Sequence, residues 1–225
     1  MKLQEQPAYT VTETAHHLSV PPSTIRYWTT AQGPNAALIK VPDTRQDDPM
    51  LLSFLNLVEL HILTTIRRKH TVPMQKIRTA IEYLRQRATQ EVDKLHPLIG
   101  EQLQTDGLYL FIEEFGDLVN ISASGQTAIR EVMQAALQRI ERNEHGIPIK
   151  LYPFTRNSID DAPSLVVIDP ALSAGRPVIS GTGLATEVIA ERYKAGESVR
   201  DLTKDYGREE AEIEEAIRCE LKAAA

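Results

Sequence analysis

The sequence predicts a mainly helical α+β fold: an N-terminal winged helix-turn-helix, a mixed central segment with short strands, and a small C-terminal helix-turn-helix domain preceded by short strands. Two short helical patterns joined by a tight turn open the chain, and three more, separated by glycines, close it. Short runs of β-branched and apolar residues stand between them. With 225 residues, 42% of them hydrophobic, the chain can form more than one core.

A capping pattern predicts the start of the first helix. Thr10-Val-Thr-Glu13 has the spacing of a capping box, so a helix should run through Leu18. The letters "SVPPS" end it, and Pro22 suits the first turn of a second helix because that turn has no use for the missing N–H. We expect this second helix at Ser23–Ala31. Residues 37–52 then form two short β-like runs around a polar turn, which predicts the wing.

The rest of the chain alternates helical and extended patterns. The helical pattern at 53–69 is apolar over much of its circumference, which implies burial on two sides. Gly146 is the expected stop signal of the helix at Thr127–Arg142. The remaining helices are expected at 73–88, 186–195, 198–206 and 208–221, and the strands at 108–113, 118–122 and 147–154 and within "LVVID" and "RPVIS".

Composition also suggests where the domains divide. The stretch "TRNSIDDAPS" is polar and carries proline and acidic residues, as linkers do. The predicted parts are an N-terminal domain at 1–90, a central α+β segment at 91–156, a linker at 157–164 and a C-terminal domain at 165–225.

The net charge of −6 argues against nucleic-acid binding, but the charge is unevenly distributed. Residues 1–90 hold 11 basic and 7 acidic side chains, whereas residues 91–161 hold 6 and 12, and residues 162–225 hold 8 and 12. Such asymmetry indicates one end that faces DNA or RNA and another end that faces something else.

The second N-terminal helix can enter the major groove of DNA with its first residues against the base edges. Ser23 and Thr24 are short enough to meet bases, and Arg26 and Tyr27 can reach phosphates. Alternatively, this is a small helical domain whose Arg and Tyr only face solvent. Further basic residues at 67–87 either add phosphate contacts or form a solvated helix face. The predicted DNA-binding residues are Thr12, Ser23, Thr24, Arg26, Tyr27, Lys40 and Arg45.

The N-terminal letters "YTVTETAHHLSVPPSTIRYWTTAQG" resemble the DNA-binding start of MerR-type regulators. Ser19 stands where that family usually has a turn glycine, and Pro21 where a capping serine is common. The family's long coiled-coil helix with a ligand or metal site has no counterpart here. The resemblance implies DNA binding and a dimer. It rests on Tyr9, Thr10, Ala15, Leu18, Val20, Thr24, Ile25, Arg26, Tyr27 and Trp28.

The glycine-rich stretch "GRPVISGTG" at 175–183 is not a nucleotide loop. Thr182 stands where a Walker loop needs lysine, and Thr186 where a dinucleotide fingerprint needs its third glycine. A strand and a sharp turn are expected instead. With the helices after it, the stretch resembles the small domain filed as domain of unknown function 433, whose members are associated with antitoxins, notably VapB-type partners of PIN-domain ribonucleases.

The last helix is acidic near its start, which repels duplex phosphate. Glu209, Glu212, Glu214 and Glu215 are therefore predicted to meet protein, either a second subunit or the basic groove of a toxin; a solvated acidic face is the alternative. Together the resemblances cover nearly the full length and imply a longer VapB subtype: a dimeric antitoxin that neutralises a PIN-domain ribonuclease and represses its operon by binding double-stranded operator DNA. A stand-alone MerR-like regulator without a toxin is the alternative function.

Other functions find less support. The single cysteine allows no intramolecular disulfide, which fits a reducing cytoplasm. No apolar run approaches the ~20 residues of a membrane span, and no signal peptide is expected. None of the six histidines has a cysteine or second histidine at metal-helix spacing, and no catalytic set is defensible. We expect a cytoplasmic non-enzyme without metal or cofactor; an enzyme that uses the glycine loop would have to bind a nucleotide.

Overall fold

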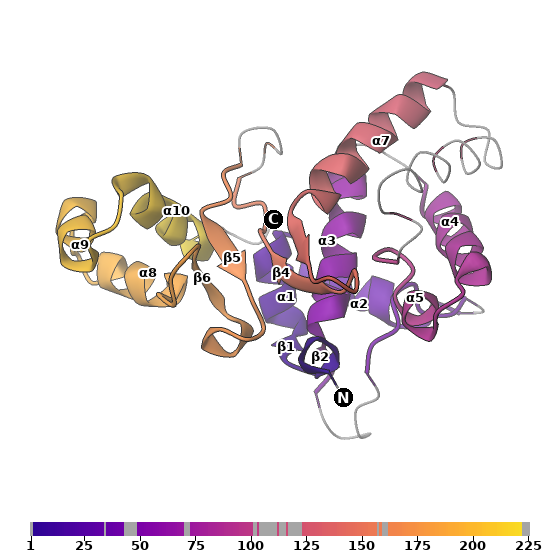
Figure 1. The fold of residues 1–225 in the computed structure, drawn as a ribbon, viewed down its shortest axis with the longest axis horizontal. Coiled ribbons are helices and arrows are strands. Elements are labelled where there is room, and N and C mark those ends of the chain that lie inside the picture. The colour runs from indigo at the N-terminus through magenta and orange to yellow at the C-terminus, as the bar shows by residue number, and fades with distance from the viewer. Residues whose placement is uncertain are drawn as a thin grey trace.

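The computed structural model describes residues 2–33, 35–42, 49–69, 73–100, 123–156, 158 and 162–221, together with positions 103, 112 and 116. It confirms the predicted mainly helical α+β fold with an N-terminal helix-turn-helix and short strands. Figure 1 shows α8, α9 and α10 at one end of the molecule and α4 and α5 at the other.

The N-terminal helices begin and end for local reasons. The Thr10 hydroxyl accepts a hydrogen bond from the Glu13 N–H at 3.1 Å, and the Glu13 carboxylate accepts one from the Thr10 N–H at 2.8 Å, which confirms the capping box. Ser19 ends the first helix in the left-handed region, at φ 52°, the conformation that glycine adopts most easily. The elements here are η1 (Leu3–Glu5), β1 (Tyr9–Thr10), α1 (Val11–Leu18) and α2 (Pro22–Thr29).

The strand pairing in the region of the predicted wing differs from the predicted one. The second β-like run contains β2 (Leu51–Leu52), which pairs antiparallel with β1, not with the first run. The first run forms no strand in its described part because its backbone bonds elsewhere: the N–H groups of Leu38 and Ile39 donate to the Trp28 carbonyl at 2.9 and 3.0 Å. The turn residues 43–48, which include the predicted DNA contact Arg45, lie outside the described residues.

Helix α3 (Phe54–Lys69) is the centre of the molecule. Every residue from Phe54 to Ile66 is buried, which confirms the predicted burial on more than one side. It packs against α1, η1, β4 (Pro148–Leu151) and α7 (Ala123–Leu137), with α4 (Met74–Arg87) and α5 (Glu91–Leu95) following it in sequence.

The sheet joins the central and C-terminal segments. It is antiparallel, in the order β3 (Ile140–Arg142), β4, β5 (Val166–Ile168), β6 (Pro177–Ile179), so it continues across the predicted linker. The prediction that the helix extends to Arg142 was wrong. Helix α7 stops at Leu137, and Ile140 pairs with Leu151 in a β-hairpin. Gly146, at φ 74°, lies in that hairpin's turn. The strands predicted at 108–113 and 118–122 lie outside the described residues, apart from Ile112, which is helical.

The C-terminal helices enclose a second core. Ile179 of β6 packs there with Ile189, Leu202 and Ile213, one from each of the three helices. Gly196 and Gly207 have positive φ values of 101° and 59° at the ends of two of these helices. The elements are η3 (Ser173–Gly175), α8 (Thr186–Lys194), α9 (Val199–Tyr206) and α10 (Glu210–Leu221).

The glycine-rich stretch contacts the N-terminal domain. Gly175 is buried with φ 81°, and a Cβ built on it would overlap the Tyr9 hydroxyl oxygen and lie 3.1 Å from the ring carbon that bears it. That hydroxyl is buried without a hydrogen-bond partner among the described residues. His16 Nε2 of α1 also lies 3.8 Å from a Glu220 carboxylate oxygen of α10. The first glycine of the stretch therefore allows the two domains to approach closely.

Gly175→Ala should reduce the free energy of unfolding by about 2–4 kcal/mol, since it adds left-handed strain and a clash in a packed interface. Adding Tyr9→Phe should restore part of the loss, because it removes the overlapping oxygen. Gly183→Ala is the control: a Cβ there meets nothing within 4 Å. Urea unfolding measures all three, and equal losses for the two alanine variants would contradict the proposed contact.

The histidine pair in this interface predicts a pH dependence. Burial, with a smaller effect of His16, lowers the pKa of the His17 imidazole to about 4. Between about pH 6.5 and pH 4 the unfolded chain binds a proton that the folded chain does not, so stability falls as pH falls. From pH 7 to pH 5 this should cost about 2 kcal/mol. Urea unfolding of His17→Gln should show a shallower decline than the unsubstituted chain; His145→Gln, on an exposed turn, should not.

Candidate nucleic-acid interface

Helix α2 presents one face to solvent and one to the core. Ile25, Trp28 and Thr29 are buried, whereas Ser23 and Arg26 are exposed and Tyr27 is 42% exposed. With 100° between successive residues, the exposed positions share a face opposite the buried ones. The exposed residues are thus free to meet DNA in the way that the sequence predicts.

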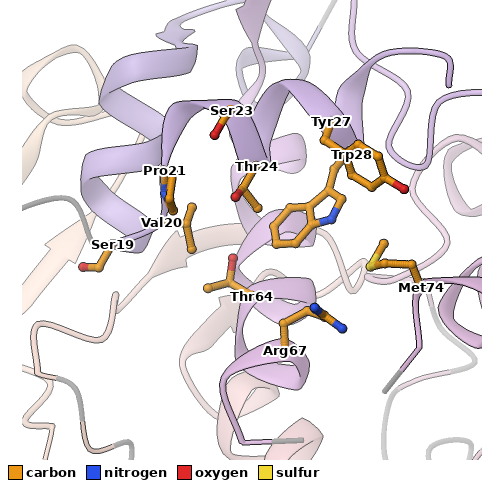
Figure 2. Close-up of a pocket in the computed structure, with 10 residues that line it drawn as sticks. All are labelled: Ser19, Val20, Pro21, Ser23, Thr24, Tyr27, Trp28, Thr64, Arg67 and Met74. Atoms are coloured by element: carbon orange, nitrogen blue, oxygen red, sulfur yellow. The ribbon is translucent and has the colours of Figure 1, made fainter. Parts of the chain in front are cut away.

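The other predicted DNA contacts lie around this face or outside the described part. Thr12 is exposed on α1, and Lys40 is exposed on the segment that follows α2. Thr24 is half-buried and, as Figure 2 shows, points from α2 toward α3 and not to the outer face. Arg45 lies outside the described residues. Ser23, Arg26 and Tyr27 are therefore the central members of the candidate interface.

Two arginines that the sequence offered as phosphate contacts hold the protein's own backbone. Arg78 Nη1 donates to the Ala36 carbonyl at 2.8 Å, and Arg85 Nη2 donates to the Leu38 carbonyl at 2.8 Å. Asn56 Nδ2 donates to the Lys40 carbonyl at 2.7 Å. Three side chains from α3 and α4 therefore fix the segment that carries Lys40. Charge counting could not reveal this, because an arginine that binds a distant carbonyl looks in sequence like one that faces solvent.

A pocket of about 570 Å³ lies between α2 and α3. Figure 2 shows Thr24 and Trp28 of α2 facing Thr64 and Arg67 of α3 across it. Met74, at the start of α4, closes one side. This pocket could not be predicted from the sequence, because its walls come from separate parts of the chain.

The predicted acidic interface on α10 is only partly at the surface. Glu209 and Glu214 are exposed, but Glu215 is 1% exposed and was wrongly predicted to face a partner. Its carboxylate binds Arg156 at 2.8 Å and also accepts the Thr155 hydroxyl. Burial raises the pKa of the Glu215 carboxyl, but these hydrogen bonds outweigh burial and lower it. Glu215 thus anchors the end of the central segment to α10.

Glu212 is also held within the protein. Its side chain is 12% exposed, binds Arg208 and accepts the Glu209 N–H at 2.9 Å. Burial raises the pKa of the Glu212 carboxyl, and the bonds from Arg208 and Glu209 lower it below the usual value. The Glu212 carboxylate therefore stabilises the N-terminus of α10 within the protein, in place of the predicted contact with a partner.

The described part of the chain shows neither a metal site nor a membrane-spanning helix. It contains no group of three or more His, Cys, Asp or Glu residues that could hold a metal ion. No helix described is long and apolar enough to cross a membrane.

Family models match both ends of this architecture. A model described as "Putative DNA-binding HTH domain" matches residues 7–81, and one described as "Protein of unknown function (DUF433)" matches residues 166–218. One end of the chain is thus similar to a DNA-binding helix-turn-helix domain and the other end to a DUF433 domain. The two matches are consistent with the predicted N-terminal and C-terminal parts, and the exposed face of α2 lies within the first match.

Two mycobacterial proteins extend the comparison. The curated "Uncharacterized protein Rv2308" of Mycobacterium tuberculosis (strain ATCC 25618 / H37Rv) is 28% identical over 163 residues, or 71% of this chain and 67% of that protein. The X-ray crystal structure of Rv2018 from Mycobacterium tuberculosis is 23% identical and has a TM-score of 0.72, covering 94% of this chain and 98% of that chain. The fold that links the helix-turn-helix to the DUF433 domain is therefore shared over nearly the whole length.

Arg26→Ala should weaken binding to duplex DNA about equally on all sequences and reduce the slope of log affinity against log salt by about 1, because a phosphate contact is lost. Ser23→Ala should instead alter sequence preference. Lys204→Ala, an equal change of charge on an exposed position of α9, is the control. Fluorescence anisotropy with duplexes from upstream of the gene measures each. Equal affinities for Arg26→Ala and Lys204→Ala would contradict the assignment of α2.

Proposed function

We propose that this chain is the antitoxin of a toxin–antitoxin pair, which binds and neutralises a PIN-domain (VapC-type) ribonuclease and represses its own operon as a homodimer on operator DNA. The observation that carries the proposal is the combination of a DNA-binding helix-turn-helix with a DUF433 domain in one chain. The sequence resemblance to VapB-type antitoxins covers the same two regions. In this proposal the chain acts by binding in the cytoplasm and performs no catalysis.

The outer surface of the DUF433 domain has the character of a protein-binding site. The large apolar side chains of Tyr193 and Leu221 are 40% and 44% exposed. They line a pocket of about 350 Å³ together with Ile217 and Glu214. An aromatic and aliphatic centre beside charged side chains is typical of interfaces between proteins.

The position and charge of this surface also fit a toxin partner. Glu210 and Glu214 are exposed on α10 and form no ion pair with any residue that the structure describes. Such carboxylates suit a basic groove that normally holds RNA, and covering the groove would stop a metal-dependent ribonuclease without a metal on the antitoxin. Figure 1 shows α8, α9 and α10 at the end of the molecule away from α2 and α4, so DNA and toxin can be bound together.

Co-expression with the adjacent reading frame should yield a complex that copurifies, and Glu214→Lys with Tyr193→Ala should weaken it by about tenfold or more, since central aromatic residues dominate such interfaces. Glu144→Lys is the matched control, on the exposed β3–β4 turn. Affinities come from biolayer interferometry, and inhibition from an RNA-cleavage assay of the neighbour.

The outcomes separate the antitoxin from the stand-alone regulator. An antitoxin suppresses cleavage in proportion to complex formed, and the double substitution relieves this suppression. DNA binding without a copurifying or inhibited neighbour would overturn the antitoxin proposal and leave a regulator that acts alone.

A further inference from the structure

The backbone that follows α2, residues 36–40, is fixed although it forms no strand. The N–H groups of Leu38 and Ile39 both donate to the Trp28 carbonyl, at 2.9 and 3.0 Å. Trp28 lies in the last turn of α2, so these two bonds tie the segment to the end of the candidate DNA-binding helix. The carbonyl groups of the segment then need donors from elsewhere in the fold.

Two arginines of α4 supply such donors. Arg78 Nη1 donates to the Ala36 carbonyl and Arg85 Nη2 donates to the Leu38 carbonyl, each at 2.8 Å. Each guanidinium also has a buried nitrogen, since Arg78 Nη2 and Arg85 Nε are enclosed and have no hydrogen-bond partner among the described residues. Both groups are therefore engaged with the protein's own backbone, and a phosphate contact by either would have to break these bonds.

Lys40 is the one charged residue of the segment. It is exposed, and its ammonium group forms no hydrogen bond or ion pair with any residue that the structure describes. Its carbonyl, in contrast, accepts a hydrogen bond from Asn56 Nδ2 at 2.7 Å, and Asn56 is fully buried on α3. The backbone of Lys40 is thus fixed while its charge stays free. Such a cation beside α2 suits a phosphate of the duplex that α2 contacts.

We propose that Arg78 and Arg85 are positioning residues for DNA binding. They do not touch DNA; they hold residues 36–40 so that Lys40 contacts the phosphate backbone beside α2. The inference rests on the proposed DNA binding by the helix-turn-helix. A lysine side chain loses rotamer freedom when it binds, and a backbone that is already fixed removes the further cost of ordering the segment. Loss of either arginine should therefore weaken DNA binding through Lys40.

A double-mutant cycle tests whether the arginines act through Lys40. The affinity of the full chain for a duplex from upstream of the gene is measured by fluorescence anisotropy at several salt concentrations. Lys40→Ala should lower affinity and reduce the slope of log affinity against log salt by about 1. Arg85→Met, which keeps an unbranched side chain and removes the donors, should lower affinity about threefold to tenfold. In the Lys40→Ala background Arg85→Met should have little further effect.

Arg87→Met is the matched control, because Arg87 is exposed on the same helix and bonds the Tyr83 hydroxyl within α4. It changes the net charge equally, so only an effect larger than that of Arg87→Met is attributed to positioning. Arg78→Met repeats the test two residues earlier in the segment. Asn56 is left unchanged, since its side chain also accepts the Ser53 N–H at the start of α3 and its loss would act on folding.

Hydrogen exchange gives a second measurement that needs no DNA. The amides of Leu38 and Ile39 should exchange faster in Arg85→Met than in the unsubstituted chain, because the segment has lost a bond to α4. The amides of α3 should keep their protection, which shows that the domain has stayed folded. Unchanged exchange at Leu38 and Ile39 would contradict the role of Arg85 in fixing the segment.

Affinity losses that add in the double variant would contradict the positioning proposal and make the arginines direct phosphate contacts. Losses for Arg78→Met and Arg85→Met no larger than for Arg87→Met would also overturn it. Absence of any anisotropy change with the unsubstituted chain is a different result: it rejects the DNA-binding function itself, and this proposal with it.

Discussion

The burial of α3 from Phe54 to Ile66 is the constraint on which the rest of the structure depends. A helix with one apolar stripe needs one neighbour, but a helix buried from Phe54 to Ile66 needs neighbours all round. The helix-turn-helix, α7 and β4 supply them from separate parts of the sequence. The central helix thereby makes the DNA-binding domain and the sheet parts of one core.

Burial on every side forces polar residues of α3 to find partners inside. Glu59 is fully buried. Its carboxylate is hydrogen-bonded to His96 Nδ1 at 2.9 Å and accepts a hydrogen bond from the Leu98 N–H at 3.3 Å. Asn56 binds the Lys40 carbonyl and so fixes the segment beyond α2. Thr64 is the contrast, since it has no such partner in the described residues. Satisfied polar groups position the candidate interface, whereas the Thr64 hydroxyl stays without a partner in the described residues, at the pocket between α2 and α3.

Local patterns predicted local structure well, and long-range partners poorly. The capping pattern at Thr10 and the periodicity of 53–69 identified a helix start and a buried helix, because each depends on residues a few positions apart. The pairing of β2 with β1 and the Arg156–Glu215 ion pair, whose residues are 59 positions apart, depend on how the chain folds back. From the sequence alone Glu215 is predicted to be exposed, because its partner Arg156 is distant along the chain.

The candidate site likewise has one part that local patterns predict and one part that depends on long-range contacts. The exposed face of α2 follows from helical periodicity, so Ser23, Arg26 and Tyr27 could be selected from sequence. The pocket between α2 and α3 could not be predicted, since Trp28 and Thr64 face each other across it only in the folded chain. Arg78 and Arg85 show the opposite error, because charge alone does not distinguish a phosphate contact from a bond to the protein's own backbone.

The sheet order has a consequence for how such chains are assembled from modules. β5 and β6 belong to the region matched by the DUF433 model, yet β5 hydrogen-bonds to β4 of the preceding segment. Cutting or exchanging the chain at this boundary would leave the β4 backbone as an open edge, prone to pairing with other chains. The module that can be grafted or inherited intact therefore begins upstream of the family boundary, at the hairpin that starts with Ile140.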